Sequence, residues 1–430
     1  MKPFERRNVM TKKTFVSFMV FVLAVVVNLL CWRDICLAAA PREVKIGATA
    51  PLTGPAAESG VATKEGLILA LEEWNKKGGV YLKEYNKKLP VNLLIEDCQS
   101  KPEVGVSVGE KLITREKVHF LIADTIHSSV TMAVMELAPK YGFPVMSAQP
   151  VSLEIAKKIA KDPKKYWSFW KGDWNSTAYA NTIFSTYQWL MEKAYFKAKN
   201  KTIAFIVEDT DYGRSNADKA GELFAGIGWK PLTTETVGLG YTDFYPQLTK
   251  LKAINPDVLV SVFTSLSSGV ALAKQFHEVG MKPSHMAVYY PIRPEYIGDT
   301  GKAADYLIWT PQMTDPINVP RHREFQEKIK KRWKVTMTQD HAFAYDTLNN
   351  TLSTIERAGS VEPKAIVKAL SQLDNTGVLG RYIFNQENHS IRDGADFLPV
   401  PTSQIQNGKD VLIWPASMAV GSYKTPPWVQ

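Results

Sequence analysis

Two patterns of apolar residues alternate along the chain, one typical of strands and the other of helices. Short runs of β-branched and aliphatic residues, such as 44–48 and 91–96, are typical of strands that are buried on both faces. Between these runs apolar residues recur at helical spacing, as Leu67, Leu71 and Trp74 do before a pair of glycines. This alternation of strand and helix predicts a parallel sheet covered by helices.

The alternation occurs in two blocks. In the first block we expect further helices around 104–112 and 130–137 and further strands at 118–123 and 145–147. The second block predicts strands at 202–207, 232–237, 258–263 and 286–290, with helices around 217–224, 243–253 and 270–276. Beyond about Thr310 the pattern favours helices at 325–333, 342–357 and 364–373, and the last forty residues favour short strands and loops. The predicted fold class is α/β, with two doubly wound parallel-sheet lobes joined by a hinge.

The first forty residues have the character of an export signal. A basic start precedes an almost wholly apolar run from Phe15 to Leu30, and Ala38-Ala39-Ala40 supplies small residues for cleavage. An uncleaved membrane anchor is the alternative, because Phe15 to Trp32 reaches the short end of a spanning helix. Once the signal is removed only Cys98 of the three cysteines remains, so no internal disulfide is expected.

The signal also changes how the net charge of +9 is interpreted. Residues 1–40 carry six basic and two acidic side chains, which leaves about +5 for the rest of the chain. The basic run Lys328–Lys334 could suggest a nucleic acid, but Glu324 and Glu327 lie close by on the same predicted helix. A solvated helix face is the favoured interpretation, and no nucleic-acid partner is expected.

The domain organisation follows from the two blocks. The hinge is expected near Lys171-Gly172. We expect the signal peptide at 1–40, the first lobe at 41–171, the second lobe at 172–310, a return to the first lobe at 311–390, and completion of the second lobe with a tail at 391–430.

Common catalytic and cofactor motifs are absent from the sequence. It contains no phosphate-binding Gly-Lys-Ser/Thr loop and no complete dinucleotide fingerprint. The seven histidines include no H-x-x-x-H pair and do not combine with cysteines. We therefore predict no metal, no cofactor, no catalytic residue and no enzymatic activity.

Polar and aromatic side chains follow the predicted strands at the edge where their carboxyl ends meet. Ser128 and Ser129 open a helix after 118–123, where they either only cap it or also help its N–H groups to hold a carboxylate. The other segments at this edge are Gln149-Pro150-Val151-Ser152, Asp209–Gly213, Thr264-Ser265 and Tyr289-Tyr290. They converge on one cleft between the lobes, and such a cleft without catalytic residues suits ligand capture by hinge closure.

Several segments in a fixed order carry a family resemblance. They are Lys45-Ile46-Gly47 with Leu52-Thr53-Gly54-Pro55, Gly66 to Ala70 with Asn75 and Gly78-Gly79-Val80, Glu96-Asp97-Cys98, Ser128-Ser129, Asp211-Tyr212-Gly213 and Asn255-Pro256-Asp257. Together they resemble the type I periplasmic binding proteins of ABC importers, nearest to the leucine/isoleucine/valine-binding branch, over about residues 45–390.

The resemblance implies site residues. Ser128, together with Ser129, would contact the ligand's α-carboxylate. Tyr212 would line the cleft from the second lobe, and Gln149 and Ser152 would supply contacts after the fourth strand. Ser59 and Thr264 stand where relatives often carry tyrosine.

One departure from the family affects the ligand. Relatives that bind amino acids carry an acidic residue after the strand matching 286–290, and this sequence has Tyr289-Tyr290-Pro291 there. A buried ammonium without an anionic partner is costly. The ligand is therefore either a branched-chain amino acid, as in the family, or an aromatic or other organic acid. Trp174, Tyr212, Tyr289 and Tyr290 either enclose such an apolar body or pack as core.

The resemblance further implies a function. The protein would be a monomeric, exported solute-binding component of an ABC importer that closes on a small ligand in the periplasm. It would deliver this ligand to permease subunits in the inner membrane. The alternatives are a ligand sensor for a signalling receptor and, for location, tethering by an uncleaved anchor.

Overall fold

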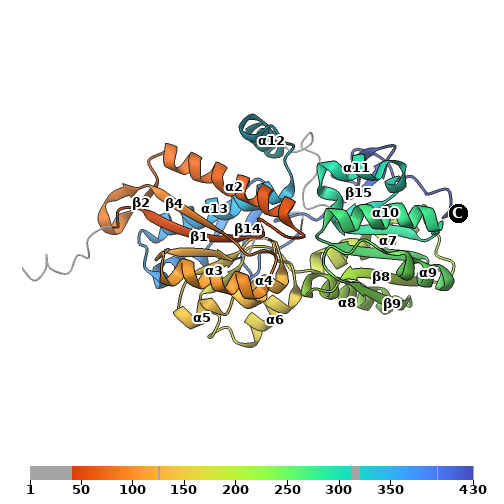
Figure 1. Ribbon diagram of the computed structural model, residues 1–430, viewed down its shortest axis with the longest axis horizontal. Helices are drawn as coiled ribbons and strands as arrows, with labels where there is room; N and C mark the ends of the chain where they lie inside the picture. Colours follow the sequence, from red (N-terminus) through yellow and green to blue (C-terminus); the bar gives the residue numbers. More distant parts are fainter. Residues whose placement is uncertain (1–40, 124–125, 311–319, 395, 430) are drawn as a thin grey trace, which may run out of the picture. The chain divides into compact units, whose positions relative to one another are not determined.

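The computed structural model describes residues 41–123, 126–310, 320–394 and 396–429 (Figure 1). The predicted signal segment at 1–40 lies outside the described residues, and residues 43–430 form one compact unit. Within the described ranges no helix combines the length and apolar character that a membrane span requires.

The first sheet is entirely parallel and has the strand order β4-β1-β5-β6-β7. Its elements are β1 (Val44–Ala50), α2 (Ala57–Lys76), β4 (Val91–Asp97), α3 (Pro102–Thr114), β5 (Phe120–Ala123), α4 (Ser128–Val134), α5 (Leu137–Tyr141), β6 (Val145–Ser147), α6 (Leu153–Lys161) and β7 (Phe169–Lys171). A small hairpin of β2 (Val80–Leu82) and β3 (Lys87–Leu89) encloses the short helix η1 (Lys83–Tyr85).

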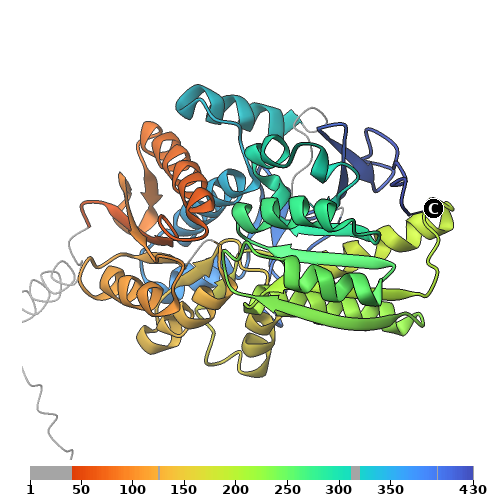
Figure 2. The same cartoon turned by 45° about the vertical axis from the view of Figure 1, so that its right-hand side comes forward.

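The second sheet has the order β16-β15-β12-β11-β10-β8-β9 (Figure 2). Its parallel part contains α7 (Thr177–Glu192), β8 (Thr202–Glu208), α8 (Asp211–Gly226), β9 (Lys230–Val237), α9 (Tyr245–Ile254), β10 (Val258–Phe263), α10 (Leu266–Val279), β11 (Ser284–Tyr289), η2 (Tyr290–Ile292), α11 (Pro294–Thr300), η3 (Gly301–Ala304) and β12 (Ile308–Thr310). The late strands β15 (Thr402–Gln406) and β16 (Lys409–Trp414) extend this sheet in antiparallel fashion beside β12.

Between β12 and β15 the chain returns to the first sheet. This return contains α12 (Pro320–Trp333), α13 (Gln339–Ala358), α14 (Pro363–Leu370), β13 (Asp374–Thr376) and β14 (Arg381–Ile383). In Figure 1, α2 lies above β1, whereas α3 and α4 lie below it, and α13 packs against α2. The approach of α2 to α13 depends on Gly66, because a Cβ there would lie 2.2 Å from the carbonyl oxygen of His341.

The predicted fold class is confirmed, since both lobes contain parallel sheets with helices on both faces. The single helix expected around 130–137 is wrong: α4 and α5 are separate there. Pro139 lacks an N–H and cannot continue the ladder of α4. The last parallel strand of the second block ends at Tyr289 instead of 290, because Tyr289 adopts a positive φ of 76° before Tyr290-Pro291.

Candidate ligand-binding cleft

A small cavity lies between the lobes at the carboxyl ends of the parallel strands. Its volume is about 10 Å³, which is the space of about one water molecule, so a larger ligand requires the lobes to move apart. The first lobe contributes Ile126, Gln149 and Val151, and the second lobe contributes Tyr179, Tyr212, Thr264 and Tyr289. Carboxyl ends of parallel strands are the usual place for a ligand in such folds.

Tyr212 reaches the cavity from the first turn of α8. The hydroxyl of Thr210 accepts the N–H of Gly213 at 3.1 Å and so caps this helix. Gly213 is required at the turn, because a Cβ there would lie 2.1 Å from the carbonyl oxygen of Glu208. The Tyr212 hydroxyl is buried and has no hydrogen-bond partner within the described part of the chain, and burial raises the pKa of Tyr212 well above its usual value. A neutral hydroxyl is therefore available to a ligand.

Gln149 reaches the cavity from the loop after β6. Its side chain is buried, and neither its amide oxygen nor its amide nitrogen has a hydrogen-bond partner among the residues that the structure describes. The loop itself is fixed, because the Ser128 hydroxyl accepts the N–H of Ser152 at 3.1 Å and Ser152 caps α6 through the N–H of Glu154. Ser128 and Ser152 thus shape the wall beside Gln149 without lining the cavity.

Glu208 is a buried carboxylate next to the cavity, at the end of β8. One of its oxygens accepts both the N–H and the hydroxyl of Thr264 at 2.8 Å, and the other accepts the hydroxyl of Thr210 at 3.0 Å. No cation pairs with it within the described part of the chain. Burial raises the pKa of Glu208 from 4.5 to about 7, although these three hydrogen bonds act in the opposite direction.

A second buried group of polar side chains joins the two lobes. Arg293, which follows η2 in the second lobe, forms an ion pair with Asp340 at the start of α13 and a hydrogen bond to Ser59 of α2. The Tyr289 hydroxyl donates to Asp340 at 2.6 Å and accepts from Arg293 at 2.9 Å. Burial acts to lower the pKa of Arg293, but the Asp340 carboxylate outweighs it and the pKa is raised. We call these four residues the interlobe network.

The other predicted site residues lie outside the cavity lining. Tyr290 points into the core of the second lobe, where its hydroxyl contacts Ser261 at 2.8 Å and its ring lies against Gly269. Trp174 packs against Tyr179 and is almost completely buried. Ser59 belongs to the interlobe network. Ser129 is half-buried in the first turn of α4.

Of the ten predicted residues, the structure thus brings Gln149, Tyr212, Thr264 and Tyr289 together around one cavity. The sequence interpretation overlooked Tyr179, Glu208, Arg293 and Asp340. Glu208 directly follows the predicted strand 202–207, so its position at the sheet edge could have identified it as a candidate site residue.

The arrangement presents polar groups to a ligand but offers little chemistry beyond binding. Around the cavity the described carboxylates Glu208 and Asp340 are engaged by threonines and by Arg293, respectively. No cluster of three or more histidine, cysteine or acidic side chains that could hold a metal occurs among the described residues. Two parallel-sheet lobes that enclose a polar cavity define a protein of the solute-binding class.

Comparison with known proteins agrees with this class. The pattern of the periplasmic binding protein family matches residues 43–404, and the chain belongs to this family. The Leu/Ile/Val-binding protein homolog 7 of Brucella suis is 24% identical over 401 residues, which span 90% of this chain and 96% of that protein.

Solved structures have the same fold. A putative branched-chain amino acid ABC transporter protein from Silicibacter pomeroyi superposes with a TM-score of 0.76 at 24% identity, covering 90% of this chain and all of the other. A solute-binding protein of an R. palustris ABC transporter, solved with benzoate, has a TM-score of 0.73 at 16% identity and covers 88% of this chain and 98% of its own.

Proposed function

We propose that this chain is the exported solute-binding component of an ABC importer, and that it captures a small organic carboxylate in the cavity between its lobes. The observation that carries this proposal is a pair of buried side chains, Gln149 and Tyr212, on opposite sides of one cavity. Neither has a hydrogen-bond partner among the described residues. Leaving such groups unsatisfied costs about 1–3 kcal/mol each. A polar ligand that pairs with both of them recovers this energy when the lobes close.

The walls of the cavity favour an acid with a flat apolar body. Tyr179, Tyr212 and Tyr289 supply aromatic surface, and Gln149 N–H and Tyr212 O–H supply donors for a carboxylate. The relatives named for leucine, isoleucine and valine support an amino acid instead, whereas the benzoate complex of a structural neighbour shows that this fold accommodates an aromatic acid.

The charges around the cavity favour one of these two ligand classes. An ammonium group would need a carboxylate, yet Asp340 is already neutralised by Arg293 and Glu208 already accepts three hydrogen bonds. Displacing Arg293 from Asp340 would leave a buried guanidinium unpaired, which typically costs about 3–5 kcal/mol. The proposed ligand is therefore a carboxylic acid without an ammonium group, with benzoate as its simplest aromatic example.

Closure of the two lobes would prepare the protein to deliver its ligand to the permease. We place the hinge near Lys171-Gly172, where the chain passes from β7 to α7, and the interlobe network then fastens the closed form. Closure would present one continuous face of both lobes to permease subunits of the inner membrane. In this proposal the protein acts as a monomer in the periplasm after removal of residues 1–40, or tethered by them.

A ligand screen tests the ligand class. Protein stripped of bound molecules by unfolding and refolding is heated with benzoate, with leucine, or with neither, and its Tm is recorded. Benzoate should raise the Tm of the protein more than that of Gln149→Leu. A Tm increase with leucine but not with benzoate would contradict the proposal that the ligand is an acid without an ammonium group. Mass spectrometry of molecules that co-purify with the protein gives a second readout.

A further inference from the structure

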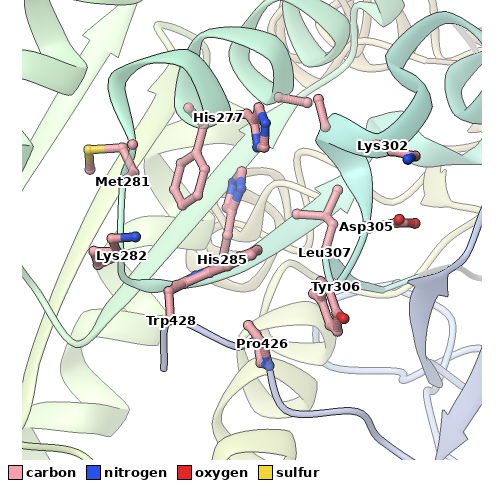
Figure 3. Close-up of a pocket in the computed structure, with 14 residues that line it drawn as sticks. His277, Met281, Lys282, His285, Lys302, Asp305, Tyr306, Leu307, Pro426 and Trp428 are labelled. Atoms are coloured by element: carbon pink, nitrogen blue, oxygen red, sulfur yellow. The ribbon is translucent and has the colours of Figure 1, made fainter. Parts of the chain in front are cut away.

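We propose that the second lobe carries a separate binding site for a small organic anion with a flat apolar body, at the end of its sheet opposite the cleft. The site is a pocket formed by the end of α10, the start of β11, the segment from η3 to β12, and residues Pro426 and Trp428 of the last described segment (Figure 3). It contains about 920 Å³ of space not filled by atoms, part of which is open to solvent.

The pocket is distinct from the cleft. His285 lines the pocket near the start of β11, and Tyr289 lines the cleft cavity at the end of the same strand. The two residues are four positions apart along an extended strand, which corresponds to about 13 Å. A molecule in the pocket therefore does not contact the Gln149 and Tyr212 side of the protein.

The floor of the pocket is apolar and rigid. The ring of His285 stacks on that of Phe276 with 4.9 Å between centroids, and its Nε2 lies 2.8 Å from the hydroxyl of Ser261, which fixes the ring. Burial lowers the pKa of His285 to about 3, so the imidazole is neutral at physiological pH. Met281 and Leu307 complete this buried surface.

A well-anchored segment forms the opposite wall. The side chains of Gln404 and Gln406 on β15 donate to the carbonyl oxygens of Lys424 and Ser422, both at 2.8 Å. This anchoring places Trp428 edge-on to Tyr306, with 5.5 Å between ring centroids. The indole Nε1 of Trp428 is buried and has no hydrogen-bond partner in the described ranges, so one donor remains available to a ligand.

The rim of the pocket is positively charged. Lys282 and Lys302 are exposed on two sides of it (Figure 3), and neither forms an ion pair with any described residue. Asp305 is the acidic residue of the lining, and one of its oxygens accepts the N–H of Gly408. The rim thus carries two lysines without an ion-pair partner among the described residues and one aspartate that already accepts a hydrogen bond, so its net charge is positive.

These features define the class of ligand. Aromatic rings on two walls accommodate a flat apolar body, while an indole N–H and two lysines around the opening favour a negatively charged substituent. Aromatic carboxylates combine both properties. A neutral analogue of the same shape would retain the stacking but would gain nothing from the lysines.

The test uses the indole N–H signals of ¹⁵N-tryptophan-labelled protein in 50 mM salt. Trp428→Phe identifies the signal of Trp428, and 2-naphthoate and its neutral amide, 2-naphthamide, are titrated separately. The naphthoate should shift the Trp428 signal. Its affinity should fall about tenfold in Lys282→Gln/Lys302→Gln, whereas that of the amide should not change. Salt at 0.5 M should weaken naphthoate binding in the same selective way.

A matched control separates the pocket from overall charge. Lys364→Gln/Lys368→Gln removes two exposed lysines from α14 in the first lobe and should leave the naphthoate affinity at Trp428 unchanged. The proposal is overturned if millimolar naphthoate leaves the Trp428 signal unmoved, or if both lysine pairs weaken binding equally. Because all lysine variants keep the aromatic walls, loss of folding does not explain a selective effect.

Discussion

Glu208 makes the stability of the protein depend on pH in a direction opposite to that of most carboxylates. Its pKa is raised from 4.5 to about 7 by burial, so between these values the folded protein binds a proton that the unfolded chain releases. The unfolding free energy therefore falls as the pH rises through this range. A difference of about 2.5 pH units corresponds to about 3 kcal/mol.

The substitution Glu208→Gln removes this titration. The unfolding free energy of the variant minus that of the wild type should increase by about 3 kcal/mol between pH 4.5 and pH 8. Urea unfolding at a series of pH values measures this difference directly. Thr264→Val should act in the opposite direction, because it removes a hydroxyl that donates to the carboxylate at 2.8 Å. A difference between Glu208→Gln and wild type that stays constant with pH would refute the reasoning.

Three further substitutions test the cavity, the interlobe network and the turn of Tyr212. Gln149→Leu removes two polar atoms that have no partner among the described residues, so it should raise the unfolding free energy of the ligand-free protein by about 1 kcal/mol. It should also weaken ligand binding at least about tenfold. A fall in both the unfolding free energy and the ligand affinity would contradict this prediction. Arg293→Met leaves Asp340 buried and unpaired and should cost about 3–5 kcal/mol in urea unfolding, and Arg293→Met/Asp340→Leu should recover most of it. Gly213→Ala should cost about 1–3 kcal/mol, since its Cβ meets the Glu208 carbonyl oxygen, whereas Gly226→Ala at the other end of α8 has open space and should be neutral or stabilising.

The pattern of the sequence predicts the parallel strands well because they are buried on both faces. Each of the runs 44–48, 202–207 and 258–263 lies within an observed strand, since nearly every residue there is apolar. The sequence pattern does not predict helix α7, because its residues do not favour a helix. Its sequence, Thr177–Glu192, is rich in threonine, serine and aromatic residues, which have low helix propensity, and packing against α8 overrides this preference.

The cavity could be predicted only in part. Gln149, Tyr212 and Thr264 follow predicted strands, and the sheet topology alone brings their segments to one edge. Tyr290 also follows a strand, but the positive φ of Tyr289 separates the two neighbours, and Tyr290 packs into the core. No local pattern links Arg293 to Asp340, because their contact depends on how one lobe meets the other.

Calorimetric titration of stripped protein with benzoate and with leucine tests the central claim most directly. The account predicts that benzoate binds in the cleft, that Gln149→Leu weakens this binding at least about tenfold, and that Lys282→Gln/Lys302→Gln leaves it unchanged. Leucine should give no heat, because no described carboxylate of the cavity is available to its ammonium group. Tight binding of leucine with no heat from benzoate would contradict the account.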